Sequence, residues 1–302
     1  MTTIGLARQG PSRRSHVRPL EPEPPAWVRE LFADAAPSSV PTRQGDAIDV
    51  VVHDRLARAT TRIADATRLA PAELSACVED AYRKVLACLL DLRLHPVRFW
   101  NYVPGIGDDV GHGMDRYMAF NRGRFAAYCN GRDSVCGQIP TASAVGIAGP
   151  DLVIDCLASS EPGTQIGNPR QINPWDYSRR YGPQPPCFAR ATVATLAARR
   201  MLLIGGTASI VGEESRHPGE TRTQAAEIVA NLDALIREAA GSDQPSLERL
   251  RDLRIYVVDA GDAETVETAL RDAAGRDVRI ECALARVCRP ELLVEVEGVA
   301  AL

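Results

Sequence analysis

Side chains suited to acid-assisted chemistry gather near the C-terminus, in the stretch 281–300. In its run LLVEVEGVA, Glu295 and Glu297 alternate with valines, so a β-strand would place both carboxyl groups on one face and the valines on the other. Arg286 and Cys288 are also two residues apart, and a strand here would point both side chains the same way. The pattern predicts two strands joined by a short turn, a β-hairpin that brings a cation, a thiol and a proton donor together.

This combination favours chemistry on a small substrate that carries a carboxylate. The guanidinium of Arg286 can bind a carboxylate through paired hydrogen bonds. A carboxylic acid such as Glu295, held in a partly apolar pocket, can keep its proton near neutral pH and act as a general acid. The alternative is structural: two solvated glutamates on a sheet surface, an Arg286–Glu295 ion pair, and Cys288 as an ordinary packing residue.

Composition limits the classes of partner. The chain has 302 residues, 45% of them hydrophobic and 25% charged, with a formal net charge of -4. Its length is typical of two ordinary domains, and its charge makes nucleic acid and anionic membranes unexpected partners. An anionic small molecule would therefore need a local cluster of arginines. Lys84 is the single lysine, which argues against Schiff-base chemistry.

Cysteines and histidines show no metal-binding spacing. The chain has 8 cysteines without a CxxC pair and 5 scattered histidines, so we expect no metal site. No apolar signal segment stands at the N-terminus and no apolar run approaches about 18 residues, so we expect neither a signal peptide nor a membrane span. Free thiols without an export signal indicate the cytoplasm.

The elements that must position these residues form a repeating pattern. Amphipathic spacing predicts helices over 71–92, 115–129, 217–240 and 263–273, and apolar runs predict strands over 48–54, 95–106, 201–211 and 253–260. A hairpin over 143–159 matches the C-terminal one, so each half runs long helix, strand, helix, hairpin. We expect an irregular lead-in over 1–46, with a short amphipathic turn at 27–32. Two α+β units follow, over 47–175 and 176–302, each a mixed sheet with helices packed on one face.

Two further features lie between and within these units. The segment 161–186 is rich in Pro, Gly, Arg and aromatic residues, including Tyr177, Arg180 and Tyr181. A long loop of this composition favours a binding loop that joins the domains, with a plain linker as the alternative. Gly205 and Gly206 interrupt the strand MLLIGGTASIV, which indicates a β-bulge or the close approach of a ligand.

Longer motifs resemble known families. Residues from about 179 to 302 resemble the YjgF/RidA-type fold, through an early GP, the strand LLIGGTAS, a TxTQxxxIxxNL helix and the strand VEVEGVA. The fuller set is similar to the chorismatase family: RFWNYVPGI, DRYMAFNRGR, GNPRQI, RRYGPQPPCFARA, GTASIVGEESRH and CRPELLVEVEG. These motifs cover most of the chain from residue 95 onward. The resemblance implies an α+β fold of two YjgF/RidA (chorismate mutase-like) units in tandem, of which the second is catalytic.

The resemblance also implies an activity and a site. Chorismatases release pyruvate from chorismate, a small-molecule substrate, and need no metal or organic cofactor. The family's acid matches Glu295. Cys288, seven residues before it, and Gly206, just before the TAS triplet, match the branch that makes 3-hydroxybenzoate. We expect the two carboxylates of chorismate to be held by arginines and oriented by tyrosines, with the candidates Arg286, Arg180, Arg124, Tyr181 and Tyr177.

Several alternatives remain open from the sequence. Within the family, the product can be a dihydroxycyclohexadiene carboxylate made by hydrolysis, or a mixture of 3- and 4-hydroxybenzoate. Outside it, a RidA-type imine deaminase would share Arg286 and Glu295, and a non-catalytic regulatory or ligand-binding protein would share the small fold. Solitary RidA-type domains form trimers, so a tandem copy predicts either a monomer or a homotrimer.

Overall fold

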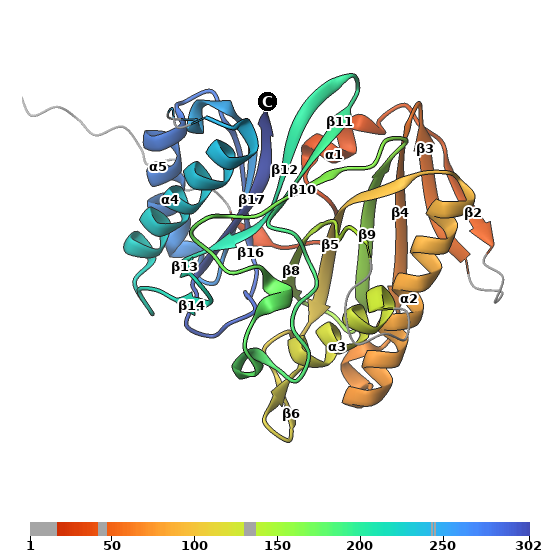
Figure 1. The fold of residues 1–302 in the computed structure, drawn as a ribbon. Helices are drawn as coiled ribbons and strands as arrows, with labels where there is room; N and C mark the ends of the chain where they lie inside the picture. Colours follow the sequence, from red (N-terminus) through yellow and green to blue (C-terminus); the bar gives the residue numbers. More distant parts are fainter. Residues whose placement is uncertain (1–16, 42–46, 130–136, 243, 245) are drawn as a thin grey trace, which may run out of the picture.

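The structure is a computed structural model that describes residues 17–41, 47–129, 137–242, 244 and 246–302. Two mixed β-sheets form its centre, and each carries a pair of helices on its outer side (Figure 1). One core packs between each sheet and its helices, and a third packs between the two sheets. The layers therefore run helices, sheet, sheet, helices.

The first unit contains a six-stranded sheet, two helices and a small hairpin. In sheet order its strands are β2 (Pro37–Pro41), β3 (Ala47–His53), β4 (Leu56–Ile63), β9 (Leu152–Ser159), β5 (His95–Pro104) and β8 (Thr141–Ile147). The helices are α2 (Pro71–Asp91) and α3 (Arg116–Cys129), and the small hairpin pairs β6 (Asp109–Gly111) with β7 (Met114–Asp115).

The second unit contains a seven-stranded sheet, two helices and another small hairpin. Its strand order is β1 (Arg18–Pro19), β16 (Arg279–Leu284), β15 (Leu250–Val257), β17 (Val294–Ala301), β12 (Arg199–Ala208), β11 (Ala191–Leu196) and β10 (Thr164–Ile166). The helices are α4 (Thr221–Ala240) and α5 (Ala263–Ala274), and the hairpin pairs β13 (Ile210–Val211) with β14 (Glu214–Ser215).

The predicted internal repeat is present. The strand order β3-β4-β9-β5-β8 in the first sheet recurs as β11-β12-β17-β15-β16 in the second. Within these five strands the neighbours are antiparallel except for the last pair, β5 with β8 and β15 with β16, which is parallel. In the second sheet β1 then pairs with β16, also in parallel. Helices follow the second and third strands of each unit, as expected from two copies of one α+β unit.

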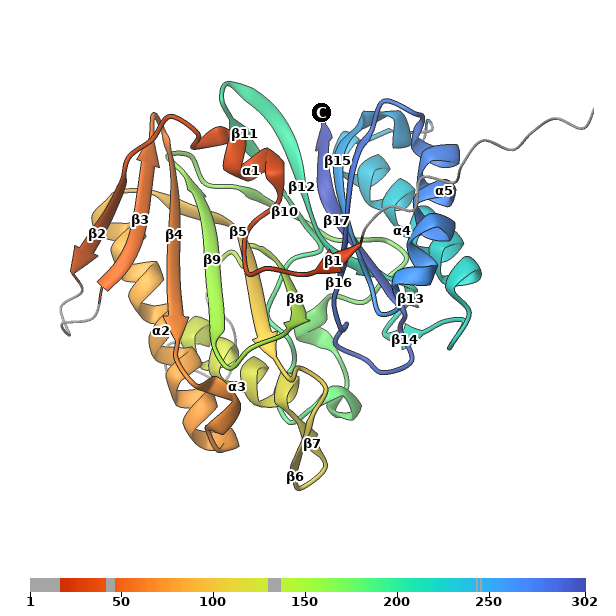
Figure 2. The same ribbon diagram turned by 180° about the vertical axis from the view of Figure 1, so that it is seen from behind.

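The two predicted hairpins are wrong in their pairing. β16 and β17 do not bond to each other, because both flank β15, and β8 and β9 flank β5 in the same way. The connecting segments 285–293 and 148–151 instead cross the end of the central strand (Figure 2). The turn signals at Gly149–Pro150 and Arg289–Pro290 are compatible with either arrangement, so the local sequence does not distinguish them.

Local sequence explains the helices well. Pro71 occupies the first turn of α2, and the Glu73 side chain accepts a hydrogen bond from the Ala70 N–H at 3.0 Å. Its apolar positions, such as Leu74 and Val78, are buried against the sheet. α4 ends at Gly241, whose φ of 61° is in the left-handed region that favours glycine. The predictions missed β4 and β11, whose threonines and arginines weaken the apolar pattern.

The lead-in contributes more structure than expected. Residues 17–41 contain β1, β2 and the short helix α1 (Ala26–Leu31), which packs Trp27 edge-on to Trp100 in the core between the sheets. Arg254 of β15 holds this segment through its bonds to the carbonyl oxygens of Glu23 and Pro24. At the other end of the first unit, β10 already belongs to the second sheet, so the chain crosses between the sheets before the expected boundary at 175.

Candidate active site

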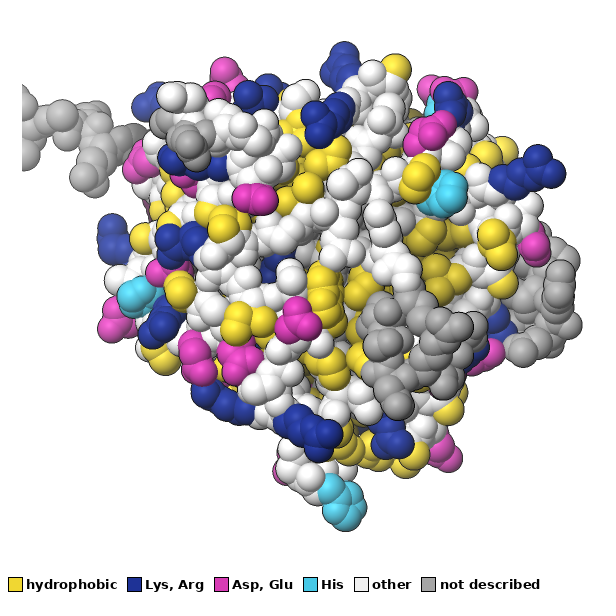
Figure 3. Space-filling model, viewed as in Figure 1, with side chains coloured by type: hydrophobic (Ala, Val, Ile, Leu, Met, Phe, Trp, Pro, Cys, Tyr) yellow, Lys and Arg dark blue, Asp and Glu magenta, His cyan; other side chains and the backbone are white. Residues whose placement is uncertain are grey.

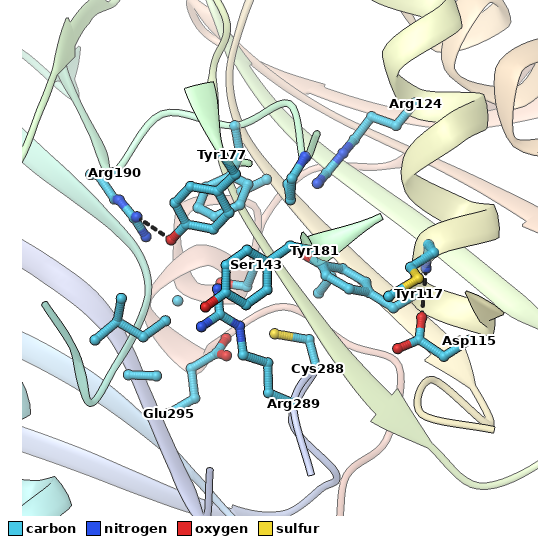
Figure 4. A pocket seen from close by; sticks show the side chains of 18 residues that line it. Asp115, Tyr117, Arg124, Ser143, Tyr177, Tyr181, Arg190, Cys288, Arg289 and Glu295 are labelled. Atoms are coloured by element: carbon cyan, nitrogen blue, oxygen red, sulfur yellow. Dashed lines mark hydrogen bonds between the residues drawn. The ribbon is translucent and has the colours of Figure 1, made fainter. Parts of the chain in front are cut away.

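A cavity lies where the two units meet; its empty volume, with the open solvent at its mouth, is about 740 Å³. Its walls come from α3 and β8 of the first unit, from the segment 177–190, and from β12, β17 and the 288–289 turn of the second unit. In Figure 3 hydrophobic side chains gather in the middle of one face of the molecule, and charged side chains surround them. Six of the eight expected site residues line the cavity (Figure 4): Glu295, Cys288, Gly206, Tyr177, Tyr181 and Arg124.

Glu295 supplies a buried carboxyl group at the cavity wall. Strand parity on β17 is as predicted, because Val294 and Val296 pack in the core beneath α4 and α5 while Glu295 and Glu297 point to the opposite side. The glutamates are 5% and 1% exposed, so the alternative of two solvated carboxylates is wrong. Burial, reinforced by the nearby Glu297 charge, raises the pKa of Glu295 to about 8. At neutral pH this group therefore carries a proton.

Glu297 lies two residues further along the strand and has a different environment. Its carboxylate accepts hydrogen bonds from Arg98 at 2.7 Å, from the indole N–H of Trp100 at 2.8 Å, and from the Ser143 hydroxyl. No hydrogen bond of this kind is present at the Glu295 side chain in the described part of the chain. Of two adjacent carboxyl groups on one strand face, one is thus fully bonded and the other is available to a ligand.

Gly206 lies directly under the Glu295 carboxyl group. A Cβ atom added there would overlap a Glu295 carboxylate oxygen and stand 2.7 Å from the carboxyl carbon. The strand register also shifts between Ile204 and Thr207, so the predicted bulge is present at Gly205–Gly206. The glycine therefore serves both the bulge and the close approach of the acid.

Cys288 lies beside Glu295 on the same wall (Figure 4). Burial and the neighbouring Glu295 raise the pKa of its thiol to about 12, so the sulfur stays protonated near neutral pH. A neutral thiol is a poor nucleophile and a poor base. Its contribution to the site is therefore its shape and a weak hydrogen-bond donor.

Two buried arginines approach the cavity from opposite sides (Figure 4). Arg124 of α3 is 1% exposed, and one of its nitrogens donates to Asn121 at 2.8 Å while Nε and Nη1 have no hydrogen-bond partner among the described residues. Arg190 is 6% exposed; it donates to Tyr177 Oη at 2.6 Å, and its Nε is also unpaired there. Burying a guanidinium whose N–H donors lack acceptors costs free energy, and a bound anion that accepts hydrogen bonds from those donors offsets this cost.

Aromatic rings and a third arginine line the cavity between these two. Arg289 stacks over the ring of Tyr181 at 3.9 Å and donates to the Glu213 carbonyl and the Ser215 hydroxyl. The Tyr181 hydroxyl is buried without a hydrogen-bond partner in the described chain. Tyr177 and Tyr181 lie 5.4 Å apart, centroid to centroid. The segment that joins the units therefore contributes directly to the site.

Two expected substrate-binding arginines lie elsewhere. The Arg286 side chain is 71% exposed and its nearest carboxylate is Asp108 at 3.6 Å. Strand parity with Cys288 does not hold, because β16 ends at Leu284 and the chain then turns away from the sheet. Arg180 is 63% exposed and forms a bidentate pair with Glu214 at 2.7 and 2.8 Å. Neither guanidinium lines the cavity.

Sequence reasoning missed other residues that do line it. Arg190 and Arg289 stand in the motifs RRYGPQPPCFARA and CRPELLVEVEG, so the signal was present, but nothing in the sequence shows which arginine of a motif turns inward. Ser143 and Asp115 come from the first unit. Asp115 caps α3 by accepting the Met118 N–H at 2.8 Å. Asp115 and the expected Arg124 begin and end the motif DRYMAFNRGR, whereas Ser143 lies in none of the quoted motifs, and its contribution becomes visible only when the two sheets are placed together.

Two broader properties concern the described residues alone. Within the described ranges, no three His, Cys, Asp or Glu side chains converge as metal ligands would. In the same residues, every helix is too short or too polar to cross a bilayer.

Comparisons with known proteins agree with this geometry. The family model described as chorismatase FkbO/Hyg5-like, N-terminal, matches residues 33–158. A 3-hydroxybenzoate synthase of Streptomyces hygroscopicus is 35% identical over 212 residues, which cover 67% of this chain and 62% of that protein. A chorismatase of Streptomyces rapamycinicus is 31% identical over 214 residues, which cover 68% of this chain and 63% of that protein. The matches thus span less than two thirds of these relatives.

A solved structure extends the match over both units. A crystal structure of a chorismatase superposes with a TM-score of 0.76 at 26% identity, covering 87% of this chain and 79% of the other. The chain belongs to the chorismatase family. The predicted α+β class, two YjgF/RidA-like units in tandem, is confirmed with it. In this chorismatase-family chain the cavity lies at the junction of the two units, so both contribute to the candidate site.

Proposed function

We propose that this chorismatase-family chain converts chorismate to 3-hydroxybenzoate and pyruvate by acid-assisted loss of the enolpyruvyl group. The observation that carries the proposal is a protonated Glu295 that shares one cavity with two buried, incompletely bonded arginines. The relative named 3-hydroxybenzoate synthase supports the product.

The cation arrangement suits a dianion. Chorismate carries one carboxylate on its ring and another on its enolpyruvyl ether. Arg124 and Arg190 face the cavity from opposite sides, so each can pair with one carboxylate through its free nitrogens. The unpaired Tyr181 hydroxyl can donate to one of these carboxylates. Binding would then satisfy buried donors that have no partner in the described protein, which gives an anionic ligand an advantage over a neutral one.

Glu295 supplies the proton that the ether lacks. An enol ether resists cleavage until its terminal vinyl carbon is protonated. Transfer of the Glu295 proton to that carbon produces an oxocarbenium, and the bond from the ether oxygen to ring C3 can then break as the pyruvate carbonyl forms. The carboxylate left on Glu295 faces the positive charges of Arg98 and Arg190, which oppose the rise in its pKa. No step draws on a group that the chain's residues and the substrate do not hold.

The ring chemistry can proceed without added water. The C4 hydroxyl oxygen bonds to C3 as the pyruvate leaves, and it releases its proton. The C4–O bond then breaks, the oxygen on C3 takes up a proton and the C3 hydrogen is lost as one, which leaves an aromatic ring with its hydroxyl at C3. Of the two protons that the ring releases, one completes this hydroxyl and the other replaces the proton that Glu295 gave to the vinyl carbon. Attack by water at C3 would instead give the diol. We infer that the neutral Cys288 thiol and the Glu295 carboxyl group above Gly206 occupy the volume that such a water needs.

The test is pyruvate release from chorismate, followed with a lactate dehydrogenase coupled assay and by chromatography of the aromatic product. The wild-type protein should release equal amounts of pyruvate and 3-hydroxybenzoate. Glu295→Gln should lower the rate by about 10²–10⁴-fold, the usual contribution of a general acid. Glu264→Gln, at an exposed position in the first turn of α5, is the matched control and should retain the rate.

Other outcomes would change the assignment. A diol product would identify a hydrolase, and a second phenol would identify a mixed 3-/4-hydroxybenzoate producer. Absence of pyruvate with folded wild-type protein would reject chorismate cleavage altogether and favour an imine deaminase or a ligand-binding protein.

A further inference from the structure

A buried polar cluster adjoins the candidate acid and belongs to none of the steps above. Its centre is Glu297, which bonds to Arg98 and Trp100 of β5 and to Ser143 of β8. Arg98 also donates to the Ser143 hydroxyl and stacks over the Trp100 ring at 4.9 Å. The carboxylate comes from the second unit and its three partners from the first. The cluster therefore lies across the junction of the units, directly behind the cavity.

Stability alone is a weak reason for such a cluster. Arg98 and Glu297 are each 1% exposed, so both charges are removed from water. The desolvation cost of a buried ion pair is commonly as large as the attraction it gains, and well-packed apolar residues are often at least as stabilising. The core on either side of the cluster is apolar, with Val145, Leu203 and Val299 packed between the sheets. Apolar side chains could have filled this volume too.

Its position relative to Glu295 indicates another role. Glu295 and Glu297 alternate on β17 and point to the same side of the sheet, which places their side chains about 7 Å apart at the base. Ser143 is shared, since its hydroxyl donates to Glu297 while its side chain lines the cavity with Glu295. We propose that the Glu297 carboxylate, bonded to Arg98, Trp100 and Ser143, is a positioning residue that keeps the proton on Glu295. This inference deepens the proposed function and rests on it for its catalytic meaning.

The other groups around Glu295 do not supply that negative charge. Cys288 from the 285–293 segment and Tyr117 from α3 both have pKa values raised by burial, so both are neutral near pH 7. Arg98 from β5 and Arg190 ahead of β11 are positive and favour the ionised form of Glu295. Tyr256, its register partner on β15, has a pKa raised by burial and is also neutral. Among these described neighbours, Glu297 is the fixed anion.

The expected effect is measurable. At an effective dielectric constant of about 20, a unit charge about 7 Å away corresponds to a pKa change of between one and two, and Arg98 offsets part of it. Replacing the charge by a neutral amide of the same shape should therefore lower the pKa of Glu295 by about one. Ser143→Ala removes one donor to Glu297 and leaves the charge, so it is the matched control and should change the pKa by much less.

The test is a pH titration of the substrate-free full chain carrying ¹³C-labelled glutamate side chains, with the Glu295 signal assigned through Glu295→Gln. Wild type should titrate near 8 and Glu297→Gln about one pH unit lower. An unchanged midpoint in folded Glu297→Gln would overturn the proposal. If that variant fails to fold because Arg98 is left without its partner, Arg98→Met/Glu297→Gln removes both charges. Its midpoint should also fall, since Glu297 outweighs Arg98 among the causes of the shift; an unchanged midpoint would again overturn the proposal.

The titration separates this inference from the proposed function because it uses no chorismate. A shifted midpoint together with a wild-type protein that releases no pyruvate would leave the positioning role intact and reject the function. Pyruvate release together with an unshifted midpoint would support the function and reject the positioning role of Glu297. If both hold, the alkaline limb of kcat/KM for pyruvate release, which reports ionisation of the free enzyme, should move down by the same interval in Glu297→Gln, a change that a purely structural role of Glu297 would not produce.

Discussion

Gly206→Ala is the smallest change that displaces the candidate acid. The backbone at Gly206 is not in the left-handed region, so alanine is allowed there without strain. Its Cβ, however, would overlap a Glu295 carboxylate oxygen and stand 2.7 Å from the carboxyl carbon. Because carbon atoms in contact need about 3.5 Å, the carboxyl group has to move by about 1 Å. The methyl group is small, so we expect little change in the free energy of unfolding.

A displacement of this size should appear in the chemistry. Moving a catalytic group by about 1 Å can cost about 100-fold in rate, so 3-hydroxybenzoate formation should fall by that order. The diol should take a larger share of the product, because the displaced carboxyl group no longer excludes water from the same volume. The assay is kcat for pyruvate release, with chromatography of the ring product and a melting temperature for each protein.

A matched control comes from the loop after β5. Gly107 also has a backbone that alanine can adopt, is exposed, and has no atom within 4 Å of an added Cβ. Gly107→Ala should retain the wild-type rate and product. If folded Gly206→Ala stays within about threefold of Gly107→Ala, with the same product, the reasoning about the position of Glu295 is refuted.

Three further changes follow from the same site. Cys288→Ala should raise the share of diol in the product. An unchanged product ratio by chromatography would show that the thiol does not exclude water. Arg124→Gln should raise KM for chorismate by about 10–100-fold through loss of charged hydrogen bonds, whereas the exposed Arg286→Gln should change it less than about twofold; equal effects in steady-state kinetics would contradict the assignment. The pKa of Glu295 is raised from 4.5 to about 8, so its proton stabilises the folded state fully below pH 4.5, and this contribution is lost as the pH rises through about 8. The free energy of unfolding of Glu295→Gln should therefore rise relative to that of wild type by at most about 1.4 kcal/mol per pH unit across that window. If thermal melting gives the same difference between the two proteins at pH 5 and at pH 8.5, the pKa of Glu295 is not raised.

Sequence periodicity was sufficient for the elements with one clear apolar face. The four long helices lie within a few residues of their expected ranges, and the alternation around Glu295 placed both glutamates on the correct face of β17. Family motifs brought Gly206, Cys288 and Glu295 together although Gly206 is far from the other two in the sequence. These features depend on local spacing or on a known pattern, which a single sequence carries.

What failed depends on how strands and units are placed in space. The hairpin over 281–300 was wrong because β15, which precedes both strands in the chain, lies between them in the sheet, and no local signal records that insertion. Arg286 faces away from the cavity because the chain leaves the sheet after Leu284, where the two-residue periodicity ends. Arg190 and Ser143 were missed because their direction is set by packing between the units. Sequence periodicity predicts which side chains share one side of a helix or strand, and tertiary packing determines which residues they contact.

The pH dependence of kcat/KM for pyruvate release from chorismate is the sharpest check that protonated Glu295 is the acid, because kcat/KM reports ionisation of the free enzyme. With the pKa of Glu295 at about 8, about nine tenths of the protein holds the proton at pH 7, against about 0.3% if the group kept its ordinary 4.5. We expect kcat/KM to be constant from pH 5 to pH 7 and to fall about tenfold per unit once the pH exceeds about 8. A kcat/KM that rises through pH 4–6 and then stays constant to pH 9 would show that the ionised carboxylate is the active form, and would contradict this expectation.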